Sequence, residues 1–327
     1  MPDPIRQRAA VTPSEVAWFA DRCNRIVENV ERVIRGKTEV IRLAVTCLAA
    51  EGHLLIEDVP GVGKTSLAKA LAGSLDGGTS RRIQCTPDLL PTDITGVSIW
   101  NEQTSGFEFR RGAVFGNVVL ADEINRASPK TQSALLEVME ERQVTVDGAT
   151  HPVPRPFLVI ATQNPVEHGG TYDLPEAQID RFMARLTMGY PDYGPEAEMI
   201  LNRAAGHSVV DLAPVVPAAE IHQMTDLVHR VYLAQPVVHY ILDIVVATRT
   251  HPEVRLGVSP RGALTLAVAA QAHAAARGSW FVTPDHVKDL VLPVLAHRVL
   301  LRPEAELAGT TPERLLRAIV ASARVPD

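Results

Sequence analysis

Residues 54–66 run Leu54-Leu55-Ile56-Glu57-Asp58-Val59-Pro60-Gly61-Val62-Gly63-Lys64-Thr65-Ser66. A short apolar run, typical of a buried strand, is followed by a glycine-rich loop and by a helical pattern that extends to about Gly73. A strand, such a loop and a helix in direct succession are typical of a phosphate-binding loop, whose backbone N–H groups surround phosphate oxygens. The start of the helix adds the positive end of its dipole to the same anion site.

The positions of this loop have separate predicted roles. Lys64 is placed to contact the β- and γ-phosphates, and Thr65 to bind Mg²⁺ with its hydroxyl, while Gly61 and Gly63 allow the backbone to approach the ligand. The strict pattern has glycine at position 58; Asp58 stands there instead, and Asp tolerates a left-handed backbone better than most residues. A glycine-rich turn without a ligand is the alternative. The predicted residues for binding the cofactor, ATP, are Pro60, Gly61, Val62, Gly63, Lys64, Thr65 and Ser66.

A second apolar run, Val118–Ala121, ends in two acids, Asp122 and Glu123. In a parallel sheet the carboxyl ends of the strands share one edge, so these acids are expected beside the phosphate-binding loop. Asp122 is the predicted Mg²⁺ residue, and Glu123 the predicted general base that activates the attacking water. A solvated acidic turn is the alternative, and it would be preferred if the loop at 58–65 were absent.

The rest of the chain predicts two parts. Strand-like runs at 81–85, 157–162 and, more weakly, 186–188 alternate with helical patterns such as 129–142, which predicts a parallel sheet covered by helices on both faces. Segments 95–113 and 143–153 do not fit this alternation and are predicted to project from the sheet as insertions. After a turn-rich break the pattern is helical, and one of the expected helices covers residues 285–301. We therefore expect an α/β domain over residues 1–193 and an all-helical domain over residues 194–327.

Composition and charge exclude several classes of protein. Of the 327 residues 46% are apolar, 32 Lys and Arg stand against 38 Asp and Glu, and the net charge of −6 is unlike that of a nucleic-acid coat protein. Apolar runs are too short for a membrane span, and no signal peptide is evident, so a cytoplasmic location is expected. Three scattered cysteines and eleven histidines show no metal-ligand spacing. Basic residues near the predicted sheet are interpreted as solvated: Arg81, Arg82, Arg110 and Arg111.

Four motifs together resemble the MoxR family of AAA+ ATPases. They are Asp58–Thr65, Leu120–Ala127, Ala161-Thr162-Gln163-Asn164-Pro165 and Leu174–Phe182, and Gly257-Val258-Ser259-Pro260-Arg261 continues the match into the helical part. The resemblance covers about residues 30–320. It implies a P-loop AAA+ core followed by a helical lid domain, with segment 95–113 as a helix-2 insert and segment 143–153 as a pre-sensor hairpin.

The resemblance also implies roles for four further residues. Asn164 is similar to the sensor-1 residue that orients the attacking water, although an Asn-Pro turn is the plain alternative. Arg181, on a helix opened by Pro175-Glu176, resembles the arginine finger that reaches a neighbouring subunit's nucleotide, with Arg185 one helical turn further as the second choice. Arg261 resembles sensor 2, acting on its own or a neighbour's nucleotide. Surface ion pairs are the alternative for these arginines.

The function predicted from these residues is Mg²⁺-dependent ATP hydrolysis by a ring, expected to be a hexamer, that remodels partner proteins. The resemblance implies partners with von Willebrand factor A domains and a chaperone-like role in maturation or metal insertion. Two alternatives stay open. One is a nucleotide-gated binding module with negligible turnover; the other is a DNA-acting AAA+ motor, against which the charge balance weighs.

Overall fold

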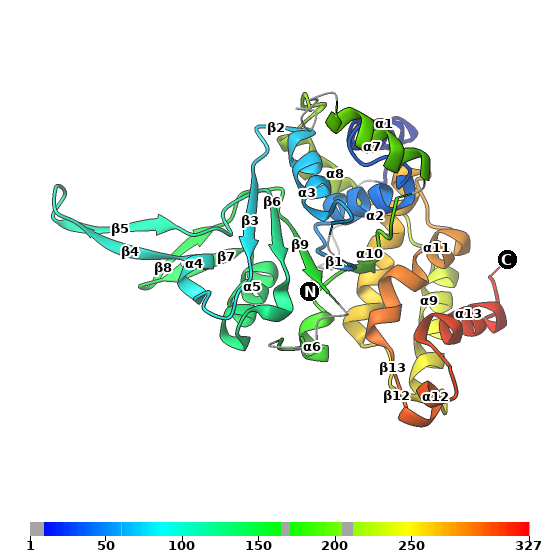
Figure 1. Ribbon diagram of the computed structural model, residues 1–327. Helices are drawn as coiled ribbons and strands as arrows, with labels where there is room; N and C mark the ends of the chain where they lie inside the picture. Colours follow the sequence, from blue (N-terminus) through cyan, green and yellow to red (C-terminus); the bar gives the residue numbers. More distant parts are fainter. Residues whose placement is uncertain (1–9, 60, 165–170, 192, 205–211, 327) are drawn as a thin grey trace, which may run out of the picture. The chain divides into compact units, whose positions relative to one another are not determined.

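The computed structural model describes residues 10–326 except residues 60, 165–170, 192 and 205–211 (Figure 1). The chain divides by its internal contacts into a sheet unit, Arg25–Ile221, and a helical unit, Met1–Asn24 with His222–Asp327. The boundary predicted at residue 193 from sequence stays a prediction. The contact-based division differs from it by placing residues 194–221 in the sheet unit and residues 1–24 in the helical unit.

A parallel sheet of five strands forms the centre of the sheet unit, as predicted. In spatial order the strands are β10 (Ala184–Leu186), β1 (Leu54–Glu57), β9 (Leu158–Gln163), β6 (Val118–Asp122) and β3 (Ser80–Gln84). The strand predicted at 186–188 begins earlier, because Ala184 pairs with Leu54 and fixes the register of β10. All five strands run in the same direction, so their carboxyl ends form one edge.

Both faces of this sheet are buried. Side chains of one parity, among them Leu55, Val119 and Val159, pack in one core with the apolar face of α5 (Pro129–Glu141). Side chains of the other parity, such as Leu120 and Ile160, are 0–1% exposed and point to the opposite face. Near-continuous apolar strands are what a sheet covered on both sides requires.

The remaining elements of the sheet unit precede, connect or follow these strands along the chain. They are α2 (Thr38–Ala49), α3 (Lys64–Gly73), β2 (Leu75–Asp76), α4 (Pro91–Thr95), η1 (Ile124–Arg126), α6 (Glu176–Ile179), α7 (Tyr193–Ala204) and β11 (Val216–Pro217). Two helices, α1 (Pro13–Glu31) and α8 (Ala218–Val228), extend across the division between the units.

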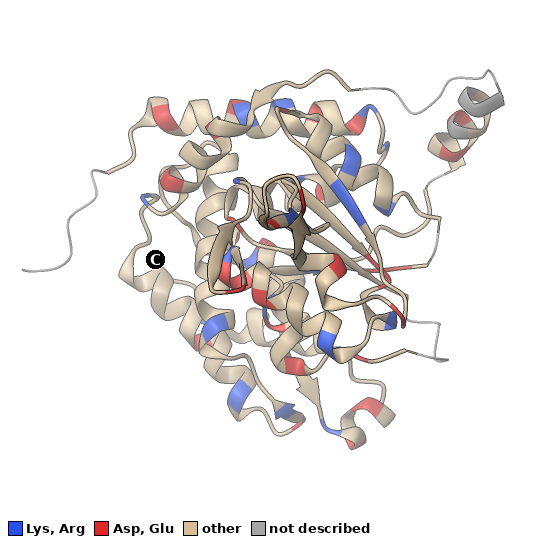
Figure 2. Ribbon diagram, turned by 90° about the vertical axis from the view of Figure 1, so that its left-hand side faces the viewer, with Lys and Arg blue, Asp and Glu red and all other residues tan. Residues whose placement is uncertain are grey.

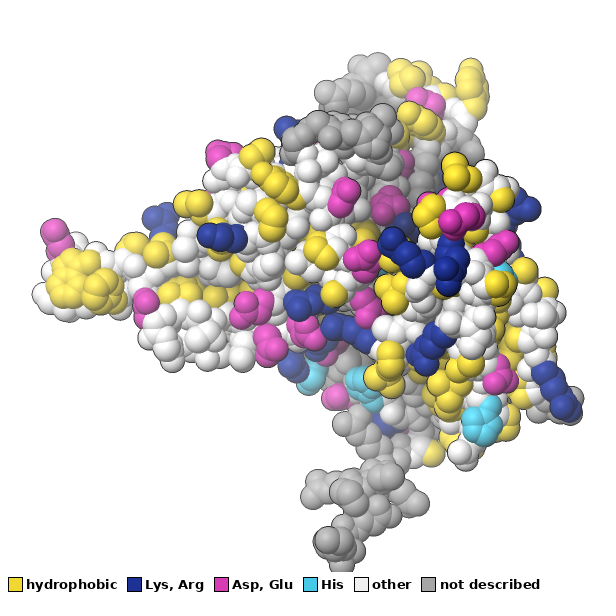
Figure 3. Space-filling view, turned by 90° about the horizontal axis from the view of Figure 1, so that it is seen from below, with side chains coloured by type: hydrophobic (Ala, Val, Ile, Leu, Met, Phe, Trp, Pro, Cys, Tyr) yellow, Lys and Arg dark blue, Asp and Glu magenta, His cyan; other side chains and the backbone are white. Residues whose placement is uncertain are grey.

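Two antiparallel hairpins occupy the segments predicted as insertions. The first is β4 (Gly96–Asn101) with β5 (Gly106–Arg111); the second is β7 (Gln143–Val146) with β8 (Ala149–Pro152). They contact each other through Phe109 and His151, whose stacked rings have centroids 3.9 Å apart. The β4–β5 hairpin projects from the sheet unit, and apolar side chains gather at its tip (Figures 1 and 3), where Trp100 and Phe107 are 54% and 74% exposed.

The helical unit is built mainly from α9 (Gln235–Thr250), α10 (Pro260–Ala276), α11 (Pro284–Leu295) and α13 (Pro312–Ser322), with the short helices η2 (Ala296–Arg298) and α12 (Pro303–Leu307). The sequence predicted an all-helical domain, but this unit also contains a pair of short strands. In that pair, β12 (Val254–Leu256) lies antiparallel to β13 (Leu300–Leu301). The helix expected to reach Leu301 therefore ends at Leu295. Figure 2 shows basic and acidic residues interspersed over the ribbon rather than gathered by sign.

The start of α1 depends on a carboxylate. Thr12 donates its backbone N–H to Glu15 at 2.8 Å, the Glu15 N–H returns a bond to the Thr12 hydroxyl, and Arg230 pairs with Glu15 at 2.6 Å. The Thr12 backbone bond and then the Arg230 bond lower the pKa of Glu15 to about 2. Thr12 and Glu15 thus form a capping box, in which each satisfies the other's backbone N–H.

This lowered pKa predicts a pH-dependent stability. A carboxyl whose pKa falls on folding stabilises the folded state above its ordinary pKa of 4.5, and the effect is lost as the pH falls from 4.5 toward about 2. We expect Glu15→Gln to lower the free energy of unfolding by about 1 kcal/mol at pH 7, a modest figure because solvent screens this carboxyl. Urea titrations at pH 7 and pH 3 should show the difference shrinking, with Glu28→Gln on the same helix as control. An equal difference at both pH values would contradict the assignment.

Candidate nucleotide-binding site

The loop after β1 is shaped as a phosphate-binding loop. Gly61 and Gly63 have φ of +89° and +96°, and Gly63 is the N-cap of α3, which begins at Lys64. A Cβ at Gly61 would meet nothing within 4 Å, so the backbone there faces open space. The Lys64 side chain is buried and donates from Nζ to the Asp58 carbonyl oxygen at 2.9 Å. These features fit a group of phosphate oxygens at the start of α3.

Other predicted residues of this loop lie where the sequence placed them along the chain. Thr65 and Ser66 are half-buried in the first turn of α3, and Val62 is half-buried in the loop itself. Pro60 lies outside the described residues.

Asp58 has a different function in the loop from the one expected. Its backbone does not have a positive φ. The tolerance of Asp for the left-handed region is therefore not what preserves the turn. Instead its buried carboxylate accepts from the backbone N–H of Val59 at 2.8 Å and of Gly189 at 2.6 Å. This side chain therefore ties the loop to the segment that follows β10.

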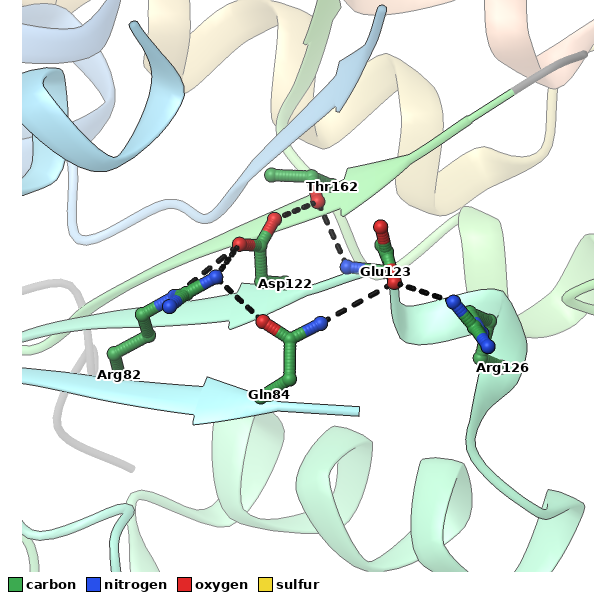
Figure 4. A network of polar contacts seen from close by, with 6 residues as sticks. All are labelled: Arg82, Gln84, Asp122, Glu123, Arg126 and Thr162. Atoms are coloured by element: carbon green, nitrogen blue, oxygen red, sulfur yellow. Dashed lines mark hydrogen bonds and ion pairs between the residues drawn. The ribbon is translucent and has the colours of Figure 1, made fainter. Parts of the chain in front are cut away.

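The two predicted acids lie at the carboxyl end of β6 (Figure 4). Asp122 is the last residue of the strand, and Glu123 follows with φ of +57°, an uncommon conformation for a residue with a Cβ. Thr162 of β9 contacts both: its hydroxyl donates to Asp122 Oδ1 at 2.7 Å and accepts from the Glu123 N–H at 2.8 Å. Thr162 is fully buried, so it fixes the direction of the Asp122 carboxylate and holds the backbone of Glu123.

Three further side chains contact the acids (Figure 4). Arg82 donates to Asp122 Oδ2 through Nε at 3.2 Å and a terminal nitrogen at 2.6 Å. Gln84 Nε2 donates to Glu123 Oε2 at 3.2 Å, and Arg126 donates to the same oxygen at 3.1 Å. Arg82 was interpreted as solvated, and its side chain is 51% exposed, but it also pairs with Asp122. Sequence analysis missed Thr162, Gln84 and Arg82 as site residues, although Thr162 lies within a motif that it quoted.

Substitution of Thr162 tests this network. We expect Thr162→Val to cost about 1–3 kcal/mol of folding free energy, because the buried Glu123 N–H loses its acceptor, and to slow phosphate release by about tenfold or more. Thr162→Ser keeps the hydroxyl and is the matched control. Urea unfolding and steady-state phosphate release measure the two effects; parent-like values for Thr162→Val would show that the hydroxyl does not orient the acids.

Asn164 directly follows β9, the strand between β1 and β6. Its side chain is 6% exposed. Since the carboxyl ends share one edge, the sheet order places Asn164 between the strand that leads into the phosphate loop and the strand that ends in Asp122.

The thiol of Cys85 lies near the acids but is no nucleophile. Burial and then the charges of Asp122 and Glu123 raise the pKa of the Cys85 thiol to about 12, so this thiol stays protonated.

The two candidate finger arginines lie on different elements. The helix predicted to carry Arg181 is short: α6 ends at Ile179, because the chain must turn before β10 begins at Ala184. Arg181 lies in that turn, with Nε 3.3 Å from Glu140 Oε2, at the rim of a cavity of about 220 Å³ between α5 and α6. Arg185 lies on β10 and pairs with Glu57 of β1 at 3.0 Å. The expectation that both face one side of a helix is wrong.

Arg261 belongs to the helical unit. Ser259 caps α10 by accepting from the Gly262 N–H at 3.0 Å, which puts Arg261 in the first turn. The preceding residues are tied to α9, since Val258 donates to the Thr248 hydroxyl at 3.0 Å. A Cβ at Gly257 would lie 2.7 Å from the Arg249 Cα, so this position requires glycine.

The donor set fits magnesium as a partner of phosphate rather than as an ion held by protein alone. Across the part of the chain that the structure describes, no group of three or more His, Cys, Asp or Glu residues could hold a metal ion. Mg²⁺ in nucleotide sites uses one or two protein oxygens together with phosphates and water. Asp122 and the hydroxyl of Thr65 offer such oxygens.

No helix in the described ranges has the length and apolar character needed to cross a membrane.

Comparison with known families defines the class of protein. A family model described as "ATPase family associated with various cellular activities (AAA)" matches residues 53–184, and one described as "AAA lid domain" matches residues 246–319. The fold is thus that of an AAA+ ATPase with a helical lid domain. The chain belongs to the MoxR family of these ATPases.

Relatives of the chain match it over nearly its whole length. It is 49% identical to the uncharacterized protein YeaC of Bacillus subtilis, over 92% of this chain and 94% of that one. It is 38% identical to the chaperone MoxR1 of Mycobacterium tuberculosis, over 93% of this chain and 82% of that one. A crystal structure of a candidate ATPase from Cytophaga hutchinsonii is 34% identical to this chain. It matches the fold with a TM-score of 0.89, over 96% of this chain and 98% of that one. The predicted resemblance is confirmed.

Proposed function

We propose that this chain hydrolyses ATP in a Mg²⁺-dependent reaction, acts as a ring of like subunits, and uses the reaction to remodel partner proteins. The observation that carries the proposal is the order β1-β9-β6 at one sheet edge. It brings the phosphate loop, Asn164 and the pair Asp122 and Glu123 to adjacent strand ends.

The proposed roles follow from these positions. Backbone N–H groups of residues 61–65 and the Lys64 amine bind the phosphates, and Thr65 and Asp122 hold the metal. Mg²⁺ held by these two residues would neutralise charge on the phosphate oxygens. Glu123 accepts the proton of the attacking water, and Asn164 orients that water without competing as a base. A pure nucleotide switch has no need of a base in this position, so we favour turnover over the nucleotide-gated alternative.

Turnover itself is tested by steady-state phosphate release from ATP with and without Mg²⁺. Release that depends on Mg²⁺ supports the enzyme. Saturable ATP binding without measurable release, in the presence of captured partners as well, would favour the nucleotide-gated binding module. Binding to DNA that weakens steeply with salt would favour the DNA-acting motor.

The ring proposal concerns Arg181, which we assign to a neighbouring subunit's nucleotide. We expect Arg181→Ala and Glu123→Gln each to be inactive alone. A mixture regains activity, because about a quarter of its subunit contacts contain both native residues if subunits mix at random in a closed ring. Arg185→Ala is the matched variant, since Arg185 is the second candidate finger and, like Arg181, pairs with a glutamate of its own chain. Recovery with Arg185→Ala but not with Arg181→Ala would make Arg185 the finger.

The partners are proposed from family resemblance and from the chaperone name of one relative. We propose a cytoplasmic hexamer whose partners carry von Willebrand factor A domains, with a role in maturation or metal insertion. Affinity capture with the Glu123→Gln protein in its ATP-bound form tests this, with Lys64→Ala as the control that lacks nucleotide. The absence of such domains among the captured proteins would remove this part of the proposal.

A further inference from the structure

We propose that Arg82 is a positioning residue whose guanidinium group holds the Asp122 carboxylate, and that a divalent ion binds Asp122 by displacing that group. The inference rests on the metal-binding role proposed above for Asp122. It concerns how readily the ion gains access to that carboxylate, and it gives a function to an arginine that the proposed reaction does not use.

Both carboxylate oxygens of Asp122 are engaged. Oδ2 accepts two N–H bonds from Arg82, at 3.2 and 2.6 Å, and Oδ1 accepts the Thr162 hydroxyl at 2.7 Å. A carboxylate oxygen has about two lone-pair sites, so Oδ2 has none left for a further ligand. The guanidinium also neutralises the single negative charge that would attract the ion. A metal that uses Asp122 Oδ2, directly or through water, must first replace Arg82.

The position of Arg82 makes this replacement feasible. Its side chain is 51% exposed, and it lies on β3, the edge strand of the sheet, whereas Asp122 is 14% exposed. An arginine at the surface can move into water at small cost, because exposed ion pairs contribute little free energy. Thr162, in contrast, is fully buried on a central strand. The arginine is therefore the partner of Asp122 that moves, and the threonine is the partner that stays.

Arg82 also connects the two acids. Its guanidinium donates to Gln84 Oε1, and Gln84 Nε2 donates to Glu123 Oε2 (Figure 4). Arg82 and Gln84 are two residues apart on one strand, so both side chains project from the same face. Displacement of Arg82 removes a donor from the Gln84 amide and frees that side chain to move. Arg82 and Gln84 thus join the proposed metal residue and the proposed base through one chain of contacts.

The strand supplies a matched control. Arg81 has the same side chain type on the same strand, but alternation directs it to the opposite face. There it packs against Gly116, where an added Cβ would lie 2.7 Å from Arg81 Cγ. Arg81→Ala removes the same charge from the sheet edge without altering the contact to Asp122.

The experiment measures metal binding directly. Mn²⁺ is titrated into each protein saturated with a non-hydrolysable ATP analogue, and free Mn²⁺ is read from its electron paramagnetic resonance signal. We expect Arg82→Ala to bind Mn²⁺ about two- to fivefold more tightly than the parent, the range that loss of one exposed ion pair allows. Arg82→Lys, which keeps the charge without the two-pronged geometry, should lie between them, and Arg81→Ala should match the parent.

The outcomes separate this inference from the proposed function. Unchanged or weaker Mn²⁺ binding by a folded Arg82→Ala protein overturns the inference, because the arginine then supports the site or has no effect on it. Asp122→Asn should weaken Mn²⁺ binding both in the parent protein and in the Arg82→Ala protein. If it weakens binding while Arg82→Ala does nothing, the metal role of Asp122 stands and only the inference fails. If Asp122→Asn has no effect, both fail.

Discussion

Glu123→Gln is expected to bind ATP with the affinity of the parent and to release phosphate about 10²- to 10⁴-fold more slowly. The groups proposed to hold the nucleotide lie on the phosphate loop and remain intact, whereas an amide cannot accept the proton of water, and a positioned base contributes about this factor. Glutamine keeps the size of the side chain and an oxygen that still accepts from Gln84 and Arg126. The fold is therefore expected to be preserved.

The measurement pairs calorimetry of ATP binding with steady-state phosphate release. Glu102→Gln, exposed in the loop of the β4–β5 hairpin, is the control and should match the parent in both. Equal release rates for Glu123→Gln and the parent would remove Glu123 from its role as base. Loss of binding would instead indicate that the left-handed backbone at Glu123 depends on the charged side chain.

The left-handed conformation of Glu123 has a structural reason. A residue with φ of +57° ends β6 abruptly and begins the short helix η1 at Ile124. The buried hydroxyl of Thr162 accepts the Glu123 N–H in that position, so the strained backbone is held by a neighbouring strand. The site therefore depends on the register of β6 and β9, which pairs Leu120 with Ile160.

This dependence on register explains which parts of the site the sequence could predict. The phosphate loop and the acid pair are continuous in sequence, and the apolar runs before them predict strands, so local patterns suffice for both. Arg82, Gln84 and Thr162 reach the acids from other strands. Their contacts depend on the pairing of Gln84 with Asp122 and on the sheet order, and no local pattern encodes either.

The errors in the predicted elements have the same origin. Sequence patterning favoured a longer helix around Arg181 and a strand at 186–188, but β10 pairs with β1 from Ala184 onward and shortens the helix. The pairing of β12 with β13 likewise ends α11 at Leu295. In each case a contact between distant segments overrides a local preference.

Lys64→Ala is expected to weaken ATP binding about 10- to 100-fold. A charged amine that donates to phosphate oxygens contributes about 1.5–3 kcal/mol, and each 1.4 kcal/mol corresponds to a factor of ten in affinity. Lys64 is buried at the start of α3, and its Nζ already lies within the loop, bonded to the Asp58 carbonyl. The side chain therefore needs little reorganisation to reach the ligand. Its removal should lower the free energy of ATP binding by nearly the whole contribution of the amine.

The matched control is Lys69→Ala, an exposed lysine on the same helix, which should bind ATP like the parent. Calorimetry gives the affinities. Thermal unfolding gives a second readout, because a ligand that binds the folded state raises the melting temperature by an amount that grows with the logarithm of its concentration over Kd, and this rise should be smaller for Lys64→Ala at the same ATP concentration. If the folded Lys64→Ala protein binds ATP as tightly as the parent, the loop after β1 does not hold the phosphates. The roles proposed for Thr65, Asp122 and Glu123 would then have to be abandoned as well, since each is defined by its position around the same phosphates.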